Sequence, residues 1–364
     1  MEPVKKLCIT GGPCAGKSTG LAVLSQKLSD RGFVPLIVPE MATLLISGNI
    51  KPDVFGSHVF QTSVIRGIKA LQEIFAHAAL ANTAARTVLL CDRGFADSAA
   101  YVPGRIYQTA LEANGIASAV EARDSHYDAV FHLVSAAIGA EAFYTTANNA
   151  ARKETIDEAR ALDEKTLSAW IGHPHLRVID NSTDFDGKIK RLDKEVCVAL
   201  GIPVPLEIEL KYECAPVALA HLPANAQHID IEQMYLVGDS TVSRRIRKRG
   251  QHGAFTYYYT EKRDVSPGVR AENERLIDAR EYEVMARFRD PTRDVIKKTR
   301  TCFLHRNQYF ELDCIRRPNK PDLYLLEIEL TEIAQKVELP GFIPVLREVT
   351  HDPAFSNFAL AEAA

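Results

Sequence analysis

The chain has 364 residues, of which 46% are hydrophobic and 25% are charged, and its formal net charge is −3. This composition is that of a globular protein with about two or three domains, and the small negative charge argues against a general nucleic-acid binder. Seven cysteines stand singly, without the spacing of zinc ligands, which is typical of reduced thiols. No apolar run approaches the roughly 18 residues of a membrane span. Because a strand is predicted almost at the N-terminus, we expect a cytoplasmic protein without a signal peptide.

The first part of the chain alternates predicted strands with predicted helices. Strands are predicted at residues 4–10, 33–40, 87–94, 128–134 and 176–181, with helices at 17–30 and 57–86. Such alternation implies a parallel sheet with right-handed crossovers. The stretch GIPVPLEI, which contains Gly201, Pro203 and Pro205, then indicates a domain boundary. We therefore expect two domains, residues 1–203 and 204–364.

A phosphate-binding motif follows the first predicted strand. The stretch GGPCAGKST at 11–19 matches G-x-x-x-x-G-K-[ST] and precedes a predicted helix. In this context glycines let backbone N–H groups converge on a phosphate at a helix start. We expect Lys17 to reach the β- and γ-phosphates and the Ser18 hydroxyl to bind Mg²⁺. The expected phosphate-binding residues are Gly11, Gly12, Pro13, Cys14, Ala15, Gly16, Lys17, Ser18 and Thr19.

Further motifs of this half resemble nucleoside and nucleotide kinases. Asp92 ends an apolar strand, from which a carboxylate can hold a magnesium ion, although a helix cap is the alternative. These motifs are DRGFADSAAY after that strand, VPEMATLL, FQTSVIRG, the arginine-bearing stretch 151–170 and DNSTDF. The whole domain resembles the P-loop nucleotide-binding domain of the nicotinamide-riboside kinase module and of a GTP-binding trafficking protein. The resemblance implies catalytic roles for Lys17, Asp92, Arg93 and Glu40, and nucleotide or phosphate contacts for Gln61, Arg152, Arg160 and Asn181. Surface or capping roles are the alternatives for Glu40 and Gln61, and a solvated helix face for the two arginines.

The second half is rich in strands with one charged face. In EIELKYE at 207–213, the charged Glu207, Glu209 and Lys211 alternate with Ile208 and Leu210. The same alternation recurs in RRIRKRG (245, 247, 249), YYYTEKR (262), AREYEVM (281, 283), IKKTRT (298, 300), YFELDC (311, 313) and LLEIEL (327, 329).

Two architectures explain this alternation. The charges can face water on one side of an open sheet. Alternatively they line a closed barrel of about eight strands, whose bore holds one small ligand. Buried charges must be paired, so such a bore would hold ions: a polyanion on the basic rows and Mg²⁺ or Mn²⁺ on the carboxylates. We expect the barrel, with Ile208 and Leu210 outside it.

These strands resemble the CYTH family, the triphosphate tunnel metalloenzymes, whose E-x-E-x-K motif matches Glu207, Glu209 and Lys211. The implied fold is α/β: a parallel-sheet P-loop domain followed by an antiparallel β-barrel, or tunnel, with flanking helices. The implied metal ligands are Glu207, Glu209, Asp313, Glu327 and Glu329, beside Ser18 and Asp92 in the first domain. The implied phosphate-gripping residues are Lys211, which also has a catalytic role, Arg245, Arg247, Lys262, Lys298 and Arg300.

Three functions are compatible with this sequence. The first is metal-dependent hydrolysis of tripolyphosphate or a nucleoside triphosphate in the tunnel, with ATP or GTP bound by the P-loop domain. The second is a small-molecule kinase with a nucleoside-like acceptor and an accessory tunnel. The third is a regulatory protein that binds GTP or ATP and senses a phosphorylated ligand or lipid headgroup. Expected ligands are Mg²⁺ or Mn²⁺, a nucleoside triphosphate and an inorganic or organic triphosphate, but no nucleic acid.

Overall fold

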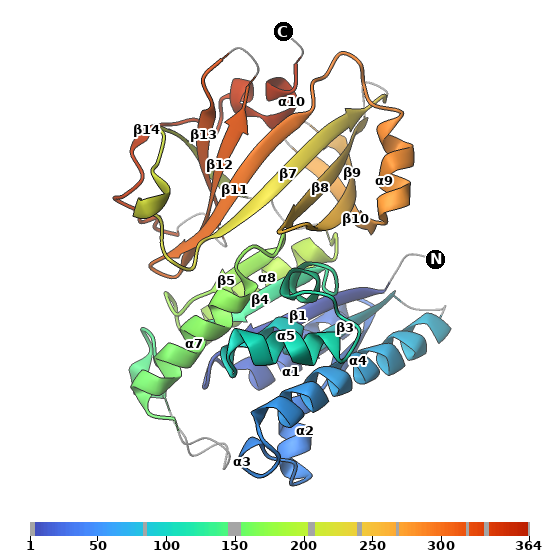
Figure 1. Cartoon of the computed structure of the whole chain (residues 1–364), viewed down its shortest axis with the longest axis vertical. Helices are drawn as coiled ribbons and strands as arrows, with labels where there is room; N and C mark the ends of the chain where they lie inside the picture. Colours follow the sequence, from blue (N-terminus) through green and yellow to red (C-terminus); the bar gives the residue numbers. More distant parts are fainter. Residues whose placement is uncertain are drawn as a thin grey trace. The chain divides into compact units, whose positions relative to one another are not determined.

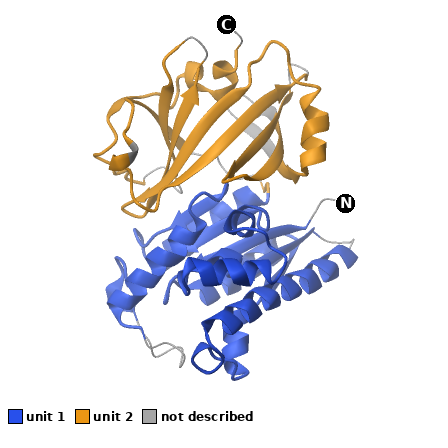
Figure 2. Cartoon of the chain, in the orientation of Figure 1, with its two compact units in different colours: residues 1–200 blue, residues 201–364 orange. Residues whose placement is uncertain are grey.

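The computed structural model describes residues 4–82, 86–144, 154–202, 208–238, 242–266, 269–317, 320–330 and 335–362, without the side chains of 208, 219, 263–266 and 269–273. Two compact units divide the chain, Met1–Leu200 and Gly201–Ala364, and Figure 2 colours them separately. Arg152 and Glu207, both predicted site residues, lie outside the described residues.

Unit 1 contains a five-stranded sheet with parallel neighbours throughout (Figure 1). Its strands are β1 (Lys5–Gly11), β2 (Phe33–Val38), β3 (Arg86–Asp92), β4 (Ala129–Leu133) and β5 (Leu176–Ile179), in the order β2-β3-β1-β4-β5. The central strands are apolar and buried, because helices cover both faces of a parallel sheet. The predicted strands of this half are all present.

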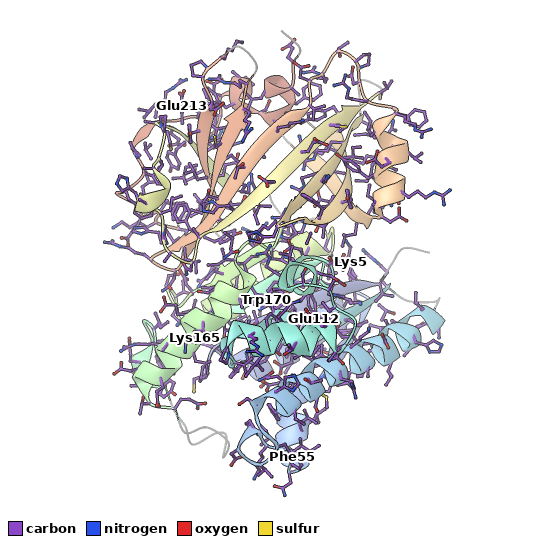
Figure 3. The ribbon with its side chains drawn as sticks, viewed as in Figure 1. Lys5, Phe55, Glu112, Lys165, Trp170 and Glu213 are labelled. Carbon is purple, nitrogen blue, oxygen red and sulfur yellow. The ribbon has the colours of Figure 1, made fainter. Side chains whose placement is uncertain are left out.

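Helices and short 3₁₀ turns connect these strands. They are α1 (Lys17–Asp30), α2 (Met41–Ser47), α3 (Pro52–Phe55), α4 (Ser57–Ala81), η1 (Phe95–Ala100), α5 (Gly104–Glu112), α6 (Ala119–Asp124), η2 (Glu141–Phe143), α7 (Ile156–Trp170) and α8 (Phe185–Ala199). Thr155 and Glu158 form a capping box that starts α7, and the fully buried Trp170 ends it (Figure 3). Since the strands are parallel, their carboxyl ends and the loops that follow share one edge of the sheet.

Unit 2 contains a nine-stranded antiparallel sheet in the order β10-β9-β8-β7-β11-β12-β13-β6-β14. The strands are β6 (Ile208–Cys214), β7 (Gln227–Leu236), β8 (Val242–Gln251), β9 (Ala254–Ser266), β10 (Val269–Ile277), β11 (Ile296–His305), β12 (Gln308–Arg316), β13 (Leu323–Leu330) and β14 (Val345–Glu348). The short elements η3 (Leu219–His221), α9 (Ala279–Ala286), η4 (Pro353–Phe355) and α10 (Asn357–Leu360) complete it. The predicted fold class, a parallel-sheet domain followed by an antiparallel β domain, is confirmed, but the closed barrel that we expected is not formed by the described strands. Within the described residues no pairing joins β10 to β14, so the pairing is that of an open sheet.

The two faces of this sheet differ in chemistry. One face carries apolar clusters, the larger of which includes Tyr212, Phe303, Phe310, Leu326 and Ile328. Leu210 packs against this cluster, as expected for the apolar side of β6, beside the segment around Phe342. The other face carries the charged residues described below. At one end of this face a separate apolar cluster lies around Tyr235 and Leu325.

One predicted strand is wrong. The alternation in AREYEVM predicts a strand that carries Glu281 and Glu283, but the segment is the helix α9. Asp278 caps this helix by accepting a hydrogen bond from the Glu281 N–H at 2.7 Å. The Asp-x-x-Glu spacing is a helix start, and it outweighs a short alternation.

No described helix has the length and apolar content required to cross a bilayer.

Candidate functional site

In unit 1 the phosphate motif forms a tight loop between β1 and α1, as the sequence predicts. Gly11 and Gly16 have φ values of 146° and 85°, in the region that favours glycine. A Cβ on Gly11 would lie 2.2 Å from the Leu133 carbonyl oxygen, so no side chain fits there. Helix α1 starts at Lys17, and its N-terminal dipole favours an anion at the loop.

Lys17 and Asp92 give this loop its charges. The Lys17 ammonium donates to the carbonyl oxygens of Gly11 and Gly12 at 3.2 and 3.4 Å. Loss of hydration, with the Arg93 charge adding to it, lowers the pKa of Lys17 to about 8. Burial raises the pKa of Asp92 to about 6.

The same neighbourhood has the donor set that Mg²⁺ prefers. Asp92 Oδ1 is a buried acceptor with no hydrogen-bond partner among the described residues. The Ser18 and Thr19 side chains are exposed on the first turn of α1. A carboxylate oxygen and a hydroxyl beside a phosphate loop suit a magnesium ion.

Glu40, Arg93 and Asp97 form an ion-paired cluster beside the loop. Arg93 Nε lies 2.6 Å from Glu40 Oε1, and Arg93 Nη1 lies 3.1 Å from Asp97 Oδ1. Asp97 Oδ2 also accepts from the Gly94 N–H at 2.8 Å, and Oδ1 accepts from the Thr10 hydroxyl. Loss of hydration would raise the pKa of Glu40, but Arg93 and Lys17 outweigh it and lower that pKa. Asp97 was not predicted; its spacing of four residues from Arg93 in DRGFAD is the signal that points to it.

A cavity of about 350 Å³ adjoins the cluster and the phosphate loop. Its polar lining includes Lys17, Glu40, Gln61, Arg93 and Tyr101. Its apolar lining includes Met41, Ile46, Phe60, Val64, Ile68, Val102 and Leu162. Gln61 is only 6% exposed, and its Oε1 has no hydrogen-bond partner among the described residues. The structure therefore brings four predicted residues, Lys17, Glu40, Gln61 and Arg93, around one cavity.

Arg160 and Asn181 contact the loop after β4. Arg160 donates to the Ala137 carbonyl at 2.7 Å and pairs with Glu141 and Asp157, and 43% of its side chain is exposed. Asn181 donates to the carbonyl oxygens of Ser135 and Ile138 at 2.8 and 2.7 Å.

Two residues beside the phosphate loop were not predicted, although one of them, Asp163, lies within the arginine-bearing stretch 151–170. Lys188 of α8 donates to the Ala15 carbonyl at 3.2 Å, and burial lowers its pKa to about 8. Asp163 of α7 accepts from the Gly12 N–H at 2.7 Å. Both act across long sequence separations, which a local pattern does not reveal.

In unit 2 the strand register places the predicted charged residues on one face. Lys211 of β6 stands opposite Glu327 of β13, which stands opposite Glu311 of β12. Arg300 of β11 stands opposite Asp313. We use the term charged face for the set Glu209, Lys211, Arg245, Arg247, Arg249, Lys262, Glu274, Lys298, Arg300, Glu311, Asp313, Glu327 and Glu329.

Arg300 is the centre of the ion pairs on the charged face. Its Nε and Nη2 each lie 2.7 Å from an oxygen of Asp313, and Nη2 lies 2.8 Å from Glu327. Its Nη1 donates to Glu311, and Lys298 also donates to Asp313. Burial would raise the pKa of Asp313, but Arg300 and Lys298 hold it well below its ordinary value. The predicted phosphate-gripping residues Lys298 and Arg300 thus contact carboxylates in this structure.

The acidic side of the charged face extends to β6. Lys211 Nζ lies 2.9 Å from Glu327 and 3.4 Å from Glu209. Loss of hydration and the nearby Glu327 carboxylate raise the pKa of Glu209, although 44% of its side chain is exposed. Glu329 stands opposite Glu209 in the register. Carboxylates that repel one another suit a divalent cation, yet no group of three His, Cys, Asp or Glu residues arranged as a metal site occurs in the described ranges.

The basic side of the charged face lies on β8. Arg247 Nη2 lies 2.9 Å from Glu274 Oε1, and Arg245 Nη2 lies 3.9 Å from the same carboxylate. Burial lowers the pKa of Arg247, with Arg245 and Arg249 adding to the effect, although Glu274 opposes it. Arg247 Nε is a buried donor with no partner in the described part of the chain. Lys262 continues this row on β9, opposite Ser243. Crowded, partly buried cations of this kind favour an anionic ligand.

Comparison with known proteins identifies the first half of the chain. A family model described as an AAA domain matches residues 6–188. The chain belongs to this AAA domain family. The match spans the phosphate loop, Asp92, the cavity and Asp163, and it makes nucleotide binding the general property of unit 1. No curated protein matches the chain.

Among the solved structures that are similar to this AAA domain protein are two that align with less than half of its residues. The inorganic triphosphatase NE1496 is 26% identical, with 44% of this chain and 97% of that chain covered and a TM-score of 0.34. The PH1819 protein from Pyrococcus horikoshii OT3 is 19% identical, with 35% of this chain and 80% of that chain covered and a TM-score of 0.28.

Proposed function

We propose that the charged face of unit 2 binds a triphosphate and hydrolyses it with the help of a divalent metal ion. One observation carries this proposal: the register places arginines, lysines and carboxylates from seven strands, β6, β8, β9, β10, β11, β12 and β13, on the same face. A protein that needed these charges only for solubility would leave them in water. Here Asp313 is fully buried and Lys298 is 6% exposed, so charge is kept inside the fold at a cost.

The roles follow from the division into a basic and an acidic side. Arg245, Arg247 and Lys262 would contact phosphoryl oxygens, joined by Lys211, Lys298 and Arg300 as these exchange carboxylate for phosphate oxygen. Glu209 and Glu329, which stand opposite each other, would hold Mg²⁺ or Mn²⁺ together with Glu207, which lies outside the described residues, and with Glu327 close by. Such an ion supplies charge neutralisation and an activated water. The arginines stabilise the charge that builds on the phosphoryl oxygens during cleavage.

The test is phosphate release from tripolyphosphate in the presence of Mg²⁺ or Mn²⁺. Glu209→Gln should lower the rate at least about a hundredfold, because it removes a ligand charge from the acidic side. Glu213→Gln (Glu213 is labelled in Figure 3) is the matched control on the same strand, since Glu213 pairs with the exposed Arg347. Equal rates for Glu209→Gln and the wild type would refute the proposal.

A second function is favoured by the cavity of unit 1. Its position beside Lys17 and Arg93 is where a phosphoryl acceptor would meet a bound nucleoside triphosphate. The apolar lining suits a planar ring, and the Gln61 Oε1 suits an N–H donor on that ring. Glu40 would accept the proton of an acceptor hydroxyl, and Arg93 would stabilise the transferred phosphoryl group.

This second function is tested by turnover of MgATP or MgGTP with a panel of nucleosides and ribosides. Acceptor-stimulated turnover that Lys17→Ala abolishes would support a kinase. Nucleotide binding with no stimulation by any acceptor would refute the kinase and favour a regulatory role for unit 1.

A further inference from the structure

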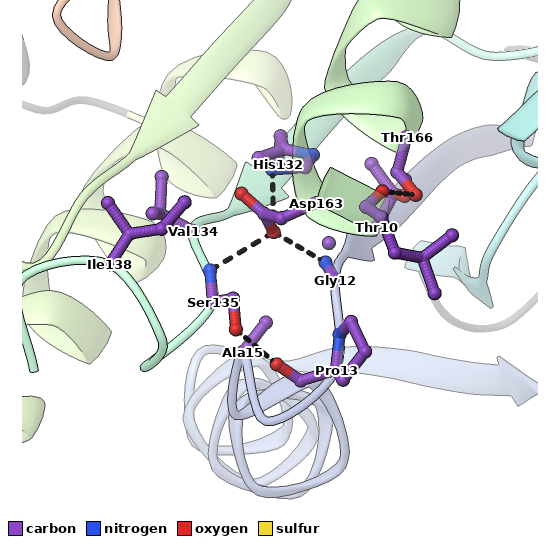
Figure 4. A network of polar contacts seen from close by, with 12 residues as sticks. Thr10, Gly12, Pro13, Ala15, His132, Val134, Ser135, Ile138, Asp163 and Thr166 are labelled. Carbon is purple, nitrogen blue, oxygen red and sulfur yellow. Dashed lines mark hydrogen bonds and ion pairs between the residues drawn. The ribbon is translucent and has the colours of Figure 1, made fainter. Parts of the chain in front are cut away.

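A buried carboxylate of α7 contacts the phosphate loop. Asp163 is 2% exposed, and its Oδ1 accepts from the Gly12 N–H at 2.7 Å and from the Ser135 N–H at 3.1 Å. His132 Nε2 lies 3.3 Å from the same oxygen. Figure 4 shows this carboxylate between the loop and the end of β4. One atom of α7 therefore joins the phosphate loop to the strand beside it.

The electrostatics favour an ionised Asp163. Burial alone would raise the pKa of this carboxyl, but the His132 ring and the N–H groups of Gly12 and Ser135 outweigh burial and lower it. An ionised acceptor makes stronger hydrogen bonds to backbone N–H groups than a neutral one. The contact thus fixes the direction of the Gly12 peptide more firmly than an ordinary turn would.

The packing leaves room only for glycine at this contact. A Cβ on Gly12 would lie 2.6 Å from Asp163 Oδ1 and 2.9 Å from Asp163 Cα. The motif G-x-x-x-x-G-K asks for no glycine at this position, since Gly12 occupies its first variable place. The close approach of α7 therefore explains a residue that phosphate binding does not.

Two more buried side chains contact the backbone of the same loop. The Ser135 hydroxyl donates to the Pro13 carbonyl, and Lys188 donates to the Ala15 carbonyl at 3.2 Å. Ser135 and Lys188 thus donate to carbonyl oxygens of the loop, and Asp163 accepts from the Gly12 N–H. Side chains thus hold the loop at Gly12, Pro13 and Ala15.

We propose that Asp163 is a positioning residue of unit 1, which orients the phosphate loop through the Gly12 peptide and ties it to α7. This proposal rests on nucleotide binding by unit 1. The adjacent residue Leu162 lines the cavity, so α7 supports both the phosphate loop and the acceptor side. A loop that loses this support would hold the triphosphate in a less favourable geometry.

The test compares three variants of the full chain by calorimetric titration with MgATP and MgGTP. Asp163→Leu removes the acceptor and should weaken nucleotide affinity at least about tenfold. Asp163→Asn keeps an oxygen in place without the charge and should recover most of that loss, to within about threefold of the wild type. Glu164→Leu, at the exposed neighbouring position on α7, should bind as the wild type does.

The outcomes distinguish a wrong positioning role from a variant that does not fold and from a chain that does not bind nucleotide. If Asp163→Leu melts as the wild type does and binds nucleotide within about twofold of it, the positioning role is refuted. If Asp163→Leu does not fold, Gly12→Ala decides, because its Cβ pushes α7 from the loop. A folded Gly12→Ala protein with wild-type affinity refutes the proposal, and one with affinity lowered at least about tenfold supports it. A wild-type chain that binds neither nucleotide refutes nucleotide binding by unit 1 itself.

Discussion

The two units build their candidate phosphate sites by different means. Unit 1 uses the backbone of a tight loop at the start of α1, with Lys17 and an ion-paired cluster around Arg93 beside it. Unit 2 uses a face of charged side chains that neutralise one another through ion pairs. Backbone dipoles need no counter-charge, whereas buried charges are stable only while their partners remain. Removal of a buried, paired charge such as Arg300 should therefore disturb folding in unit 2, whereas removal of Lys17 should disturb ligand binding in unit 1.

The largest effect is expected from Arg300→Met. It leaves Asp313, Glu311 and Glu327 without their shared guanidinium, and such a loss costs about 3–5 kcal/mol of unfolding free energy. Urea denaturation followed by circular dichroism measures it. Lys297→Met is the matched control, because the neighbouring Lys297 side chain is 65% exposed. A loss below about 1 kcal/mol would show that the ion pairs of unit 2 do not support its fold.

Lys17→Ala should affect binding rather than folding. Removing a charge-assisted contact to the β- and γ-phosphates lowers nucleotide affinity about a hundredfold, with little change in the melting temperature. Calorimetric titration with MgATP and MgGTP measures the affinity. Lys27→Ala, on the same helix but paired with Asp193, serves as the control. Equal affinities for the two variants would contradict the assignment of the phosphate loop.

Asp92→Asn should stabilise unit 1 while it weakens magnesium-dependent binding. The pKa of Asp92 is raised from 3.8 to about 6 in the folded chain, so ionisation above that pH opposes folding. The cost of about 2–3 kcal/mol is present at pH 7.5 and disappears as the pH falls through 6 toward 3.8.

Denaturation at pH 7.5 and pH 4 tests the Asp92→Asn prediction. The variant should be more stable than the wild type at the higher pH, and the difference should shrink at the lower pH. A variant that is less stable at pH 7.5 would show that the carboxylate has a partner that stabilises its charge.

Gln61→Leu should have the smallest effect and should act only on the acceptor side. Leucine fills the volume of Gln61 but offers no Oε1 to a ring N–H, so acceptor-dependent turnover should fall about tenfold while nucleotide affinity stays unchanged. Steady-state kinetics with the best nucleoside or riboside acceptor measure it. Glu73→Gln, at an exposed position of α4, is the control. A change in nucleotide affinity instead would place Gln61 on the nucleotide side.

Local patterns predicted much of this molecule. The phosphate loop, the five strands of unit 1 and the charged faces of β6, β8, β11, β12 and β13 each follow from spacing within one segment. Contacts between distant segments of the chain were harder to predict. Asp163 reaches Gly12 across 151 residues, and no local spacing signals that contact.

The errors and gaps also have physical reasons. The helix α9 was missed because a capping aspartate outweighs alternation over a few residues. Barrel closure depends on whether the outer strands β10 and β14 meet, and side-chain alternation is the same in an open and a closed sheet. The ion pairs of Arg300 with three carboxylates likewise depend on register, which alternation alone does not fix.

The central claim is that the chain carries two separate phosphate sites, and one crossed measurement tests it most directly. Magnesium-dependent phosphate release from tripolyphosphate and binding of MgATP or MgGTP are measured for the wild type, Lys17→Ala, Glu209→Gln and the double variant. We predict that Lys17→Ala keeps tripolyphosphate hydrolysis and loses nucleotide binding, that Glu209→Gln does the reverse, and that the double variant loses both. Loss of tripolyphosphate hydrolysis in Lys17→Ala, with hydrolysis retained in Glu209→Gln, would contradict the account.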